Sequence, residues 1–221
     1  MKNSLLYFSV LFSLFFNFSL VAQELKINST TMQYDNIDKV SIFEGDVSAS
    51  DEKGNKLFSQ YAKYNKLEEI VELKGSTKII TSGGYEITSS DVIFDNKKNL
   101  IYSKKKTSII DKVGNNILVE MFNYSTLTNI FFSKGNIKIK DINKNNYNFS
   151  EIYIDENKKQ IIGSDVKAYL NQPGISANID NDPRFFANTI SLNEKTSTFE
   201  KGIFTYCKNE GKDKCPPWVL Q

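Results

Sequence analysis

The chain has 221 residues, of which 40% are hydrophobic and 24% charged, and its 28 basic and 26 acidic side chains nearly cancel. A balance of this kind gives no reason to expect nucleic acid as a partner. Because the sequence contains no histidine, Ser-His-Asp and Cys-His nucleophilic arrangements and histidine metal sites are excluded. We therefore predict no catalytic residues, no metal site and no cofactor.

The first predicted element is a secretory signal peptide over residues 1–22. Lys2 precedes an uncharged apolar run from Leu5 to Val21, and Ala22 followed by Gln23 is a plausible cleavage junction. The alternative is a retained membrane anchor, since roughly 17 apolar residues are at the low end of what spans a bilayer. We favour export with cleavage.

From Gly45 onward the sequence repeats every 30 residues, in rows that start at Gly45, Gly75, Lys105 and Gly135. A period of this length indicates a stack of equivalent modules. Within each row the apolar residues are spaced by two, which places them on one face of a strand. One row cannot bury such a face alone, so the rows must stack around a shared groove or core. The residues that we predict to line it are Val47, Leu57, Tyr64, Ile79, Ile87, Phe94, Ile109, Ile117, Tyr124, Ile139, Tyr147 and Ile154.

Each row is expected to bend once. The spacing of the apolar columns rises from two to three between Ser59 and Ala62, and the same slip recurs in the later rows. A β-bulge or a corner between two strand segments produces such a slip.

Polar clusters between the apolar columns have the composition of turns. They lie at residues 51–55, 95–99 and 155–159, and Gly83-Gly84 has the character of a hairpin turn. Asp95 and Asp155 share one column, and we interpret them as turn caps rather than as paired catalytic carboxylates. The basic run at residues 104–106 is interpreted as a solvated turn or edge strand, with a contact for acidic groups as the alternative.

The repeat loses register after Gly163. Turns are predicted at residues 172–174 and 181–184, before strand-like composition resumes over residues 185–192. Cys207 and Cys215, the two cysteines of the chain, follow this region. In an exported protein two such thiols tend to be oxidised, either with each other or each with a cysteine elsewhere.

Taken together, these motifs resemble one family. The signal peptide, the Gly-x-Val repeats, the Asn-Asp-Pro-Arg-Phe-Phe-Ala segment at residues 181–187 and the closing Phe-Thr-x-Cys…Cys-Pro-Pro-Trp at residues 204–218 look like the periplasmic N-terminal region of LptD proteins. The repeats alone resemble the wider OstA-like group, which includes the periplasmic bridge proteins LptA and LptC.

The resemblance implies an all-β fold, an elongated open β-jellyroll built from stacked strand repeats of about 30 residues. It implies OstA-like repeats over residues 23–200 and a cysteine-containing connector over residues 201–221, toward a C-terminal β-barrel beyond Gln221. The implied function is lipopolysaccharide transport in the periplasm and at the outer membrane, with acyl chains sheathed in the apolar groove. The implied partners are lipopolysaccharide or lipid A, an LptA-like bridge protein that pairs with an edge strand, and the outer-membrane barrel with its LptE-like plug. Cys207 and Cys215 stand where family members form disulfides with the barrel.

Two departures leave alternatives open. No cysteine follows the signal peptide, and the sequence ends before any barrel, so the chain is either a fragment of a longer protein or a stand-alone LptA-like bridge. Two other classes compete with lipid transport. One is a purely structural β-solenoid with a closed core, and the other is a β-helix that binds or cleaves polysaccharide. An enzyme of that kind would need a cluster of carboxylates or basic residues on one strand face, which the rows lack.

Overall fold

The computed structural model describes residues 25–171, 181–193 and 195–208. These residues form strands and turns, joined in one antiparallel sheet of 16 strands. The strands are β1 (Lys26–Asn28), β2 (Thr31–Asp35), β3 (Val40–Ser50), β4 (Lys56–Asn65), β5 (Ile70–Ile80), β6 (Glu86–Asp95), β7 (Leu100–Ser103), β8 (Thr107–Ile110), β9 (Asn116–Val119), β10 (Phe122–Ser125), β11 (Ile130–Lys140), β12 (Asn146–Asp155), β13 (Gln160–Tyr169), β14 (Asn181–Leu192), β15 (Ser197–Glu200) and β16 (Ile203–Lys208).

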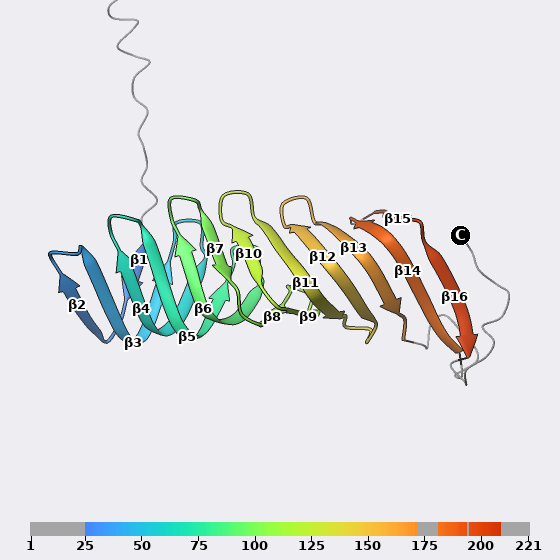
Figure 1. Cartoon of the computed structure of the whole chain (residues 1–221), viewed down its shortest axis with the longest axis horizontal. Helices are drawn as coiled ribbons and strands as arrows, with labels where there is room; N and C mark the ends of the chain where they lie inside the picture. The colour runs from blue at the N-terminus through green and yellow to red at the C-terminus, as the bar shows by residue number, and fades with distance from the viewer. Residues whose placement is uncertain (1–24, 172–180, 194, 209–221) are drawn as a thin grey trace, which may run out of the picture.

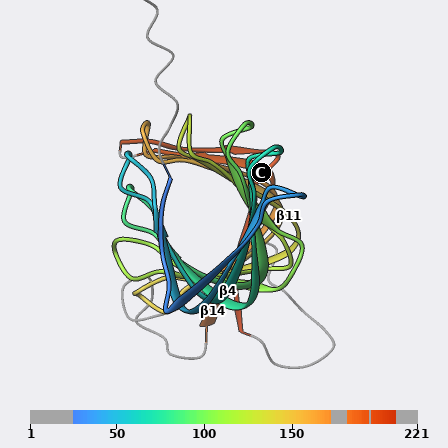
Figure 2. The ribbon, with the colours of Figure 1, turned by 90° about the vertical axis from the view of Figure 1, so that its left-hand side faces the viewer.

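The strands follow one another along the long axis of the molecule, with β1 and β2 at one end and β14 to β16 at the other (Figure 1). Seen along this axis, the curled sheet has the outline of an elongated ring (Figure 2). Each 30-residue row supplies two antiparallel strands, such as β3 and β4 or β5 and β6. The prediction of an elongated all-β jellyroll built from 30-residue strand repeats is confirmed.

A line of bulges bends the sheet along its whole length. The pairing register shifts between Glu44 and Val47, between Phe58 and Tyr61, between Leu73 and Ser76, and between Lys134 and Ile137. Each shift is the predicted slip of one residue, which a bulge introduces together with a local bend. The long strands therefore turn a corner without ending.

Glycine occupies the bulge in three strands, although Asp165, in the same 30-residue column of the uninterrupted β13, adopts a φ of 51° without glycine. Gly45, Gly75 and Gly135 stand in the bulges with φ of 75°, 75° and 110°, a backbone conformation that glycine adopts without steric cost. In the third row Lys105 occupies the same place, and there the strand is interrupted between β7 and β8. Its neighbour is interrupted at the same level, between β9 and β10.

Two rows of hairpin turns border the bent sheet. We call the turns at residues 36–39, 66–69, 96–99, 126–129 and 156–159 the first lip, and those at 51–55, 81–85, 111–115 and 141–145 the second lip. The turn clusters predicted from composition all lie in these lips, and so does Gly83-Gly84. In every first-lip turn the last residue has a φ between 50° and 57°. The 30-residue equivalence thus extends to the backbone angles.

The core occupies the inside of the roll. Its buried apolar side chains form one cluster that runs from Phe43 in β3 to Ile190 in β14. Inward positions on neighbouring strands lie in register, as in the row that joins Tyr64, Val71, Phe94 and Ile101. Burial of apolar surface inside a continuous antiparallel sheet is what holds the rows together.

The C-terminal part agrees with one sequence prediction and differs from another. The 30-residue columns shift by one residue after Gly163, because Val166 and Ala168 are buried where the columns would place Lys167 and Tyr169. Strand β13 nevertheless continues to Tyr169 and pairs with β12. Residues 181–184 form no turn but begin β14, which pairs with β13 and β16. Pro183 lies near the start of this strand, where a residue without a backbone N–H is tolerated. Its carbonyl accepts a hydrogen bond from the Leu170 N–H at 3.0 Å.

Several predicted features lie outside the described residues. These are the signal peptide at residues 1–22, the turn at residues 172–174 and Cys215. Strand β16 carries the sheet as far as Lys208, so it takes up the first part of the segment expected to be a connector.

Candidate functional site

The predicted groove residues all belong to the core. Nine of the twelve are at most 3% exposed. The other three, Tyr64, Ile139 and Tyr147, are partly buried and pack against the same cluster. Their common environment is an apolar interior that extends through the stacked rows. Their role toward a lipid stays a prediction.

Side chains fill the middle of this interior. The backbone of Gly163 lies directly under the ring of Phe149, whose Cδ1 atom is 2.5 Å from where a Cβ atom of residue 163 would stand. Phe122 and Phe131 stack with ring centroids 6.1 Å apart and an angle of 10° between the ring planes. A ligand that enters here must therefore displace side chains or widen the roll, since a packed interior leaves little free volume.

The apolar interior reaches solvent at both ends of the roll. Met32 and Tyr34 in β2 pair with Phe43 and Ser41, which face inward, yet they are 59% and 51% exposed. At the other end Phe199 pairs with the inward Ile190 and is 43% exposed, with its ring 4.3 Å from that of Phe185. Inward positions are exposed there because β2 and β15 lie at the ends of the strand order.

The second lip repeats one side-chain arrangement. In the turns that begin at Asp51, Asp111 and Asp141, the carboxylate accepts bonds from the backbone and side-chain N–H groups of the Asn four residues later. The Asn side-chain carbonyl oxygen then accepts a hydrogen bond from a backbone N–H of the next turn of the lip, as Asn55 Oδ1 does from the Ser82 N–H at 2.9 Å. These bonds tie each turn to the following one and stiffen the lip.

The first lip is tied together by its backbone. The first N–H of each turn donates to the carbonyl that ends the previous turn, as from Asn96 to Glu69 at 3.0 Å and from Glu156 to Asn129 at 3.0 Å. Asp95 and Asp155 cap these turns, as predicted. The Asp95 carboxylate accepts from the backbone N–H and the ammonium group of Lys98, and Asp155 accepts from the backbone of Asn157 and Lys158.

The capping bonds change the acidity of both carboxylates. Burial alone would raise the pKa of Asp95, but the bonds from Lys98 outweigh it and hold that pKa below its usual value. The backbone bond from Lys158 lowers the pKa of Asp155. Neither group is therefore tuned for proton transfer near neutral pH, which agrees with a structural role.

The two lips meet in a seam. Lys53 Nζ on the second lip donates to the carbonyl oxygen of Thr126 on the first lip at 2.6 Å. Farther along, the Thr81 hydroxyl on the second lip donates to Glu156 Oε1 on the first lip at 3.3 Å. The Tyr124 hydroxyl donates to the other carboxylate oxygen of Glu156 at 3.2 Å.

The turn at residues 81–85 departs from the pattern of its lip. Thr81 and Tyr85 replace the Asp and Asn of the other turns, and the Thr81 hydroxyl accepts the Tyr85 N–H at 3.1 Å. Burial raises the pKa of Glu156 to about 7 and that of Tyr85 to about 12. Sequence reasoning missed this site, although the missing Asp and Asn in one row of four would have marked it.

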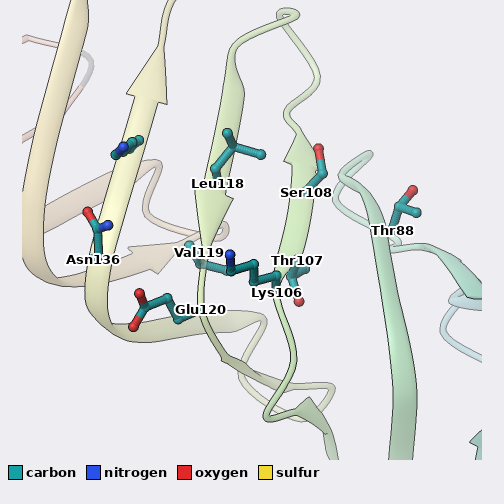
Figure 3. A pocket seen from close by; sticks show the side chains of 9 residues that line it. Thr88, Lys106, Thr107, Ser108, Leu118, Val119, Glu120 and Asn136 are labelled. Atoms are coloured by element: carbon teal, nitrogen blue, oxygen red, sulfur yellow. The ribbon is translucent and has the colours of Figure 1, made fainter.

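The outer face carries a shallow depression where the third row is interrupted (Figure 3). Its volume is about 370 Å³. Its lining residues are Thr88, Lys106, Thr107, Ser108, Leu118, Val119, Glu120, Asn136 and Lys138. Lys104, Lys105 and Lys106 are exposed beside it, and Lys105 Nζ is 3.8 Å from Asp91 Oδ2. The prediction that residues 104–106 form a solvated segment is confirmed.

The cysteines are only partly placed. The backbone of Cys207 lies in β16 opposite Asp182, and Cys215 is outside the described residues. Within the described ranges no three His, Cys, Asp or Glu side chains come close enough together to hold a metal ion. The same ranges include no helix of the length and hydropathy needed to cross a membrane.

Comparison with known proteins finds likeness in structure rather than in sequence. Neither a family model nor a curated protein matches the chain. Among solved structures, the crystal structure of LptH from Pseudomonas aeruginosa, the LptA-homologous periplasmic component of its lipopolysaccharide transport device, is similar with a TM-score of 0.45 and 17% identity. The similarity covers 51% of this chain and 82% of LptH, and it concerns the course of the strands.

Proposed function

We propose that the interior of the roll holds the acyl chains of a lipid and that the chain is a periplasmic module of lipopolysaccharide transport. The observation that carries the proposal is the single apolar core from Phe43 to Ile190, whose inward side chains become exposed at both ends, at Tyr34 and Phe199. An interior of this kind can shield hydrocarbon from water at about 25 cal/mol per Å² of apolar surface removed. The motif resemblance supplies the lipid class.

The repeat suits transport along the roll. Because equivalent side chains recur every 30 residues, successive positions offer an acyl chain nearly the same free energy, and none of them traps it. The sugars and phosphates of the lipid stay in water outside the seam. Direction must come from an energy source outside this chain, since the sequence has no nucleotide-binding motif.

The ends of the roll supply surfaces for protein partners. Among the described residues, strand β2 pairs only with β3, so its other edge exposes backbone N–H and C=O groups that an added strand can pair with. An LptA-like bridge protein would dock there and continue the interior. At the other end, the outer-membrane barrel with its LptE-like plug is the expected partner if the chain is the N-terminal region of an LptD protein.

The two cysteines separate the LptD role from the bridge role. In the LptD role Cys207 or Cys215 forms a disulfide with the barrel, and in the bridge role it does not. Full-length protein that runs identically on reducing and non-reducing gels, with Cys207→Ser/Cys215→Ser leaving assembly unchanged, would favour the bridge.

Photocrosslinking tests the lipid proposal. A photoreactive phenylalanine analogue replaces Tyr64 or Tyr147, which face the interior and are partly buried, and purified lipopolysaccharide is added. Matched controls replace Tyr61 and Tyr153, which lie on the outer face, Tyr61 under Lys74 Nζ at 5.4 Å and Tyr153 with 42% exposure. Labelling from the inner pair alone is expected. Equal labelling from both pairs would remove the lipid proposal.

A structural β-solenoid is the second candidate, and the filled interior favours it. Nine of the twelve groove residues are already at most 3% exposed without any lipid. A solenoid with a permanently closed core would give no crosslink from either inner tyrosine, and lipid would leave its thermal stability unchanged. A lipid carrier would instead be stabilised by mass action.

A further inference from the structure

The contact between Glu156 and the turn at residues 81–85 has a steric requirement. A Cβ atom at Gly83 would overlap the carboxylate of Glu156, which lies against the backbone of this glycine. Gly83 itself has no left-handed backbone conformation, unlike Gly84 with φ 85°. A glycine at position 83 is therefore needed for the approach of the Glu156 side chain and not for the shape of the turn.

This approach joins parts of the chain that lie far apart in sequence. Glu156 is 75 residues from Thr81, and it also binds the hydroxyl of Tyr124, whose ring is in the core. One carboxylate thus connects the first lip, the second lip and the buried interior. In the other second-lip turns, the carboxylate that accepts the turn's hydrogen bonds is an Asp of the same turn. In the turn at residues 81–85, the carboxylate is that of Glu156, which lies across the seam.

We propose that Glu156 and Gly83 form a latch that holds the seam of the roll closed, and that the latch releases when the Glu156 carboxyl group loses its proton. The functional meaning of this release, entry of acyl chains through the seam, rests on the proposed function. The release itself does not depend on any lipid.

Burial fixes the sign of the pH dependence of Glu156, and the polar and charged groups around it act in the opposite direction. Tyr124 and Tyr85 face it from the strand and turn beside it, Asp111 acts on Tyr85, and Lys112 is the nearby cation. Burial raises the pKa of Glu156 from 4.5 to about 7, against the opposing effects of Tyr124, Thr81 and Lys112. In an open seam the exposed carboxyl group would regain its ordinary pKa. The closed seam is thus fully favoured below pH 4.5 and loses this advantage as the pH rises toward about 7.

The distance between the lips reports the state of the latch. In a Cys207→Ser/Cys215→Ser background, spin labels are placed at Val113→Cys on the second lip, where the native side chain is 59% exposed, and at Lys158→Cys on the first lip, where it is 73% exposed. Pulsed electron resonance without lipid then measures the inter-label distance at about pH 5 and about pH 8, on either side of the raised pKa of about 7. A longer-distance population is expected to appear at the higher pH.

Two substitutions make the test specific. Glu156→Gln keeps a group that can bond to Thr81 and Tyr124 but removes the charge, so the short distance should persist at both pH values. Gly83→Ala keeps the charge but fills the space of the carboxylate, so the longer distance should be populated at both. A control pair on one lip, Val113→Cys with Ile142→Cys, should show no change and excludes unfolding.

The outcomes separate the latch from the lipid function. The same distance distribution for the wild-type protein at both pH values, or a closed seam in Gly83→Ala, would overturn the latch. A working latch together with equal crosslinking from inner and outer tyrosines would overturn the lipid proposal and leave the latch standing.

Discussion

The ring of Phe149 packs on the backbone of Gly163 and fills the space that a side chain at position 163 would occupy. Ile190 closes the same space from the next strand, with its Cγ2 atom 3.3 Å from the position of a Cβ atom. Gly163 is buried and faces inward, and its lack of a side chain allows Phe149 and Ile190 to pack there.

Gly163→Ala should therefore destabilise the roll by overpacking. We expect a loss of about 1–3 kcal/mol in the free energy of unfolding, measured by urea denaturation. Adding Phe149→Leu should recover part of the loss, because the shorter side chain frees the space. Ser164→Ala, at a half-buried neighbouring position, is the control. If Gly163→Ala unfolds at the same urea concentration as the wild type, the close packing seen here is wrong.

At Gly75 in the bulge of β5, the energetic effect of the backbone conformation can be measured separately from side-chain packing. Nothing lies within 4 Å of a Cβ atom built there, and φ is 75°. Gly75→Ala should cost about 1–2 kcal/mol because alanine is strained in this conformation. Gly75→Asn should cost less, since asparagine adopts it more readily. Equal losses for both variants, measured by the same denaturation assay, would contradict the proposed reason.

The hydrogen bonds between Asp51 and Asn55 should contribute strongly to the stability of the second lip. Asn55 is fully buried, and its side chain bonds to Asp51 and to the Ser82 backbone. Asn55→Ala removes the side-chain bond to Asp51 and the acceptor of the Ser82 N–H, and we expect a loss of about 1–3 kcal/mol. Asn116→Ala, at an exposed position whose nearest bond is 3.5 Å long, should change stability little. Thermal melting of the two variants side by side checks the difference.

Thermal stability should depend on pH in two opposite ways. Asp95 and Asp155 have lowered pKa values in the fold, so their contribution is present above pH 3.8 and is lost as the pH falls through the lowered values. Glu156 has a raised pKa, so its contribution is present below pH 4.5 and is lost as the pH rises to about 7.

Melting temperatures across this range therefore should fall on both sides of a maximum. Asp95→Asn is expected to reduce the loss on the acid side, where Asp155 still contributes, and Glu156→Gln is expected to reduce the loss on the neutral side. A Glu156→Gln variant that still loses stability between pH 4.5 and about 7 would show that another group causes the loss.

The sequence predicts the repeating part of the fold well because its signals are local. Alternation of apolar residues, the slip after Ser59 and the Gly, Asn and Asp clusters each describe one strand or turn, and the 30-residue period repeats them. The twelve groove residues accordingly lie in one core.

Features that depend on distant contacts could not be predicted in this way. Nothing near Glu156 indicates that its carboxylate meets Gly83, because that contact follows from the curl of the whole sheet. The strand at residues 181–184 has the composition of a turn, and its pairing with β13 and β16 overrides that local preference. Lys105 was visible as a departure from glycine, but the interruption of the strand does not follow from that departure, because Asp165 in the same column leaves β13 continuous.

The turns that are bonded across the seam are far apart in the sequence. Lys53 meets Thr126 and Thr81 meets Glu156, so these two second-lip turns are each bonded to a first-lip turn 73 or 75 residues later. A chain of two rows could form strands and a bend but would have no turn far enough along to close on. At the start of the roll, the first-lip turns at residues 36–39, 66–69 and 96–99 would need counterparts that precede the strands described here. Seam closure thus requires the whole stack of rows. Because bonded turns are 73 or 75 residues apart, one lip extends beyond the other at the end of the roll.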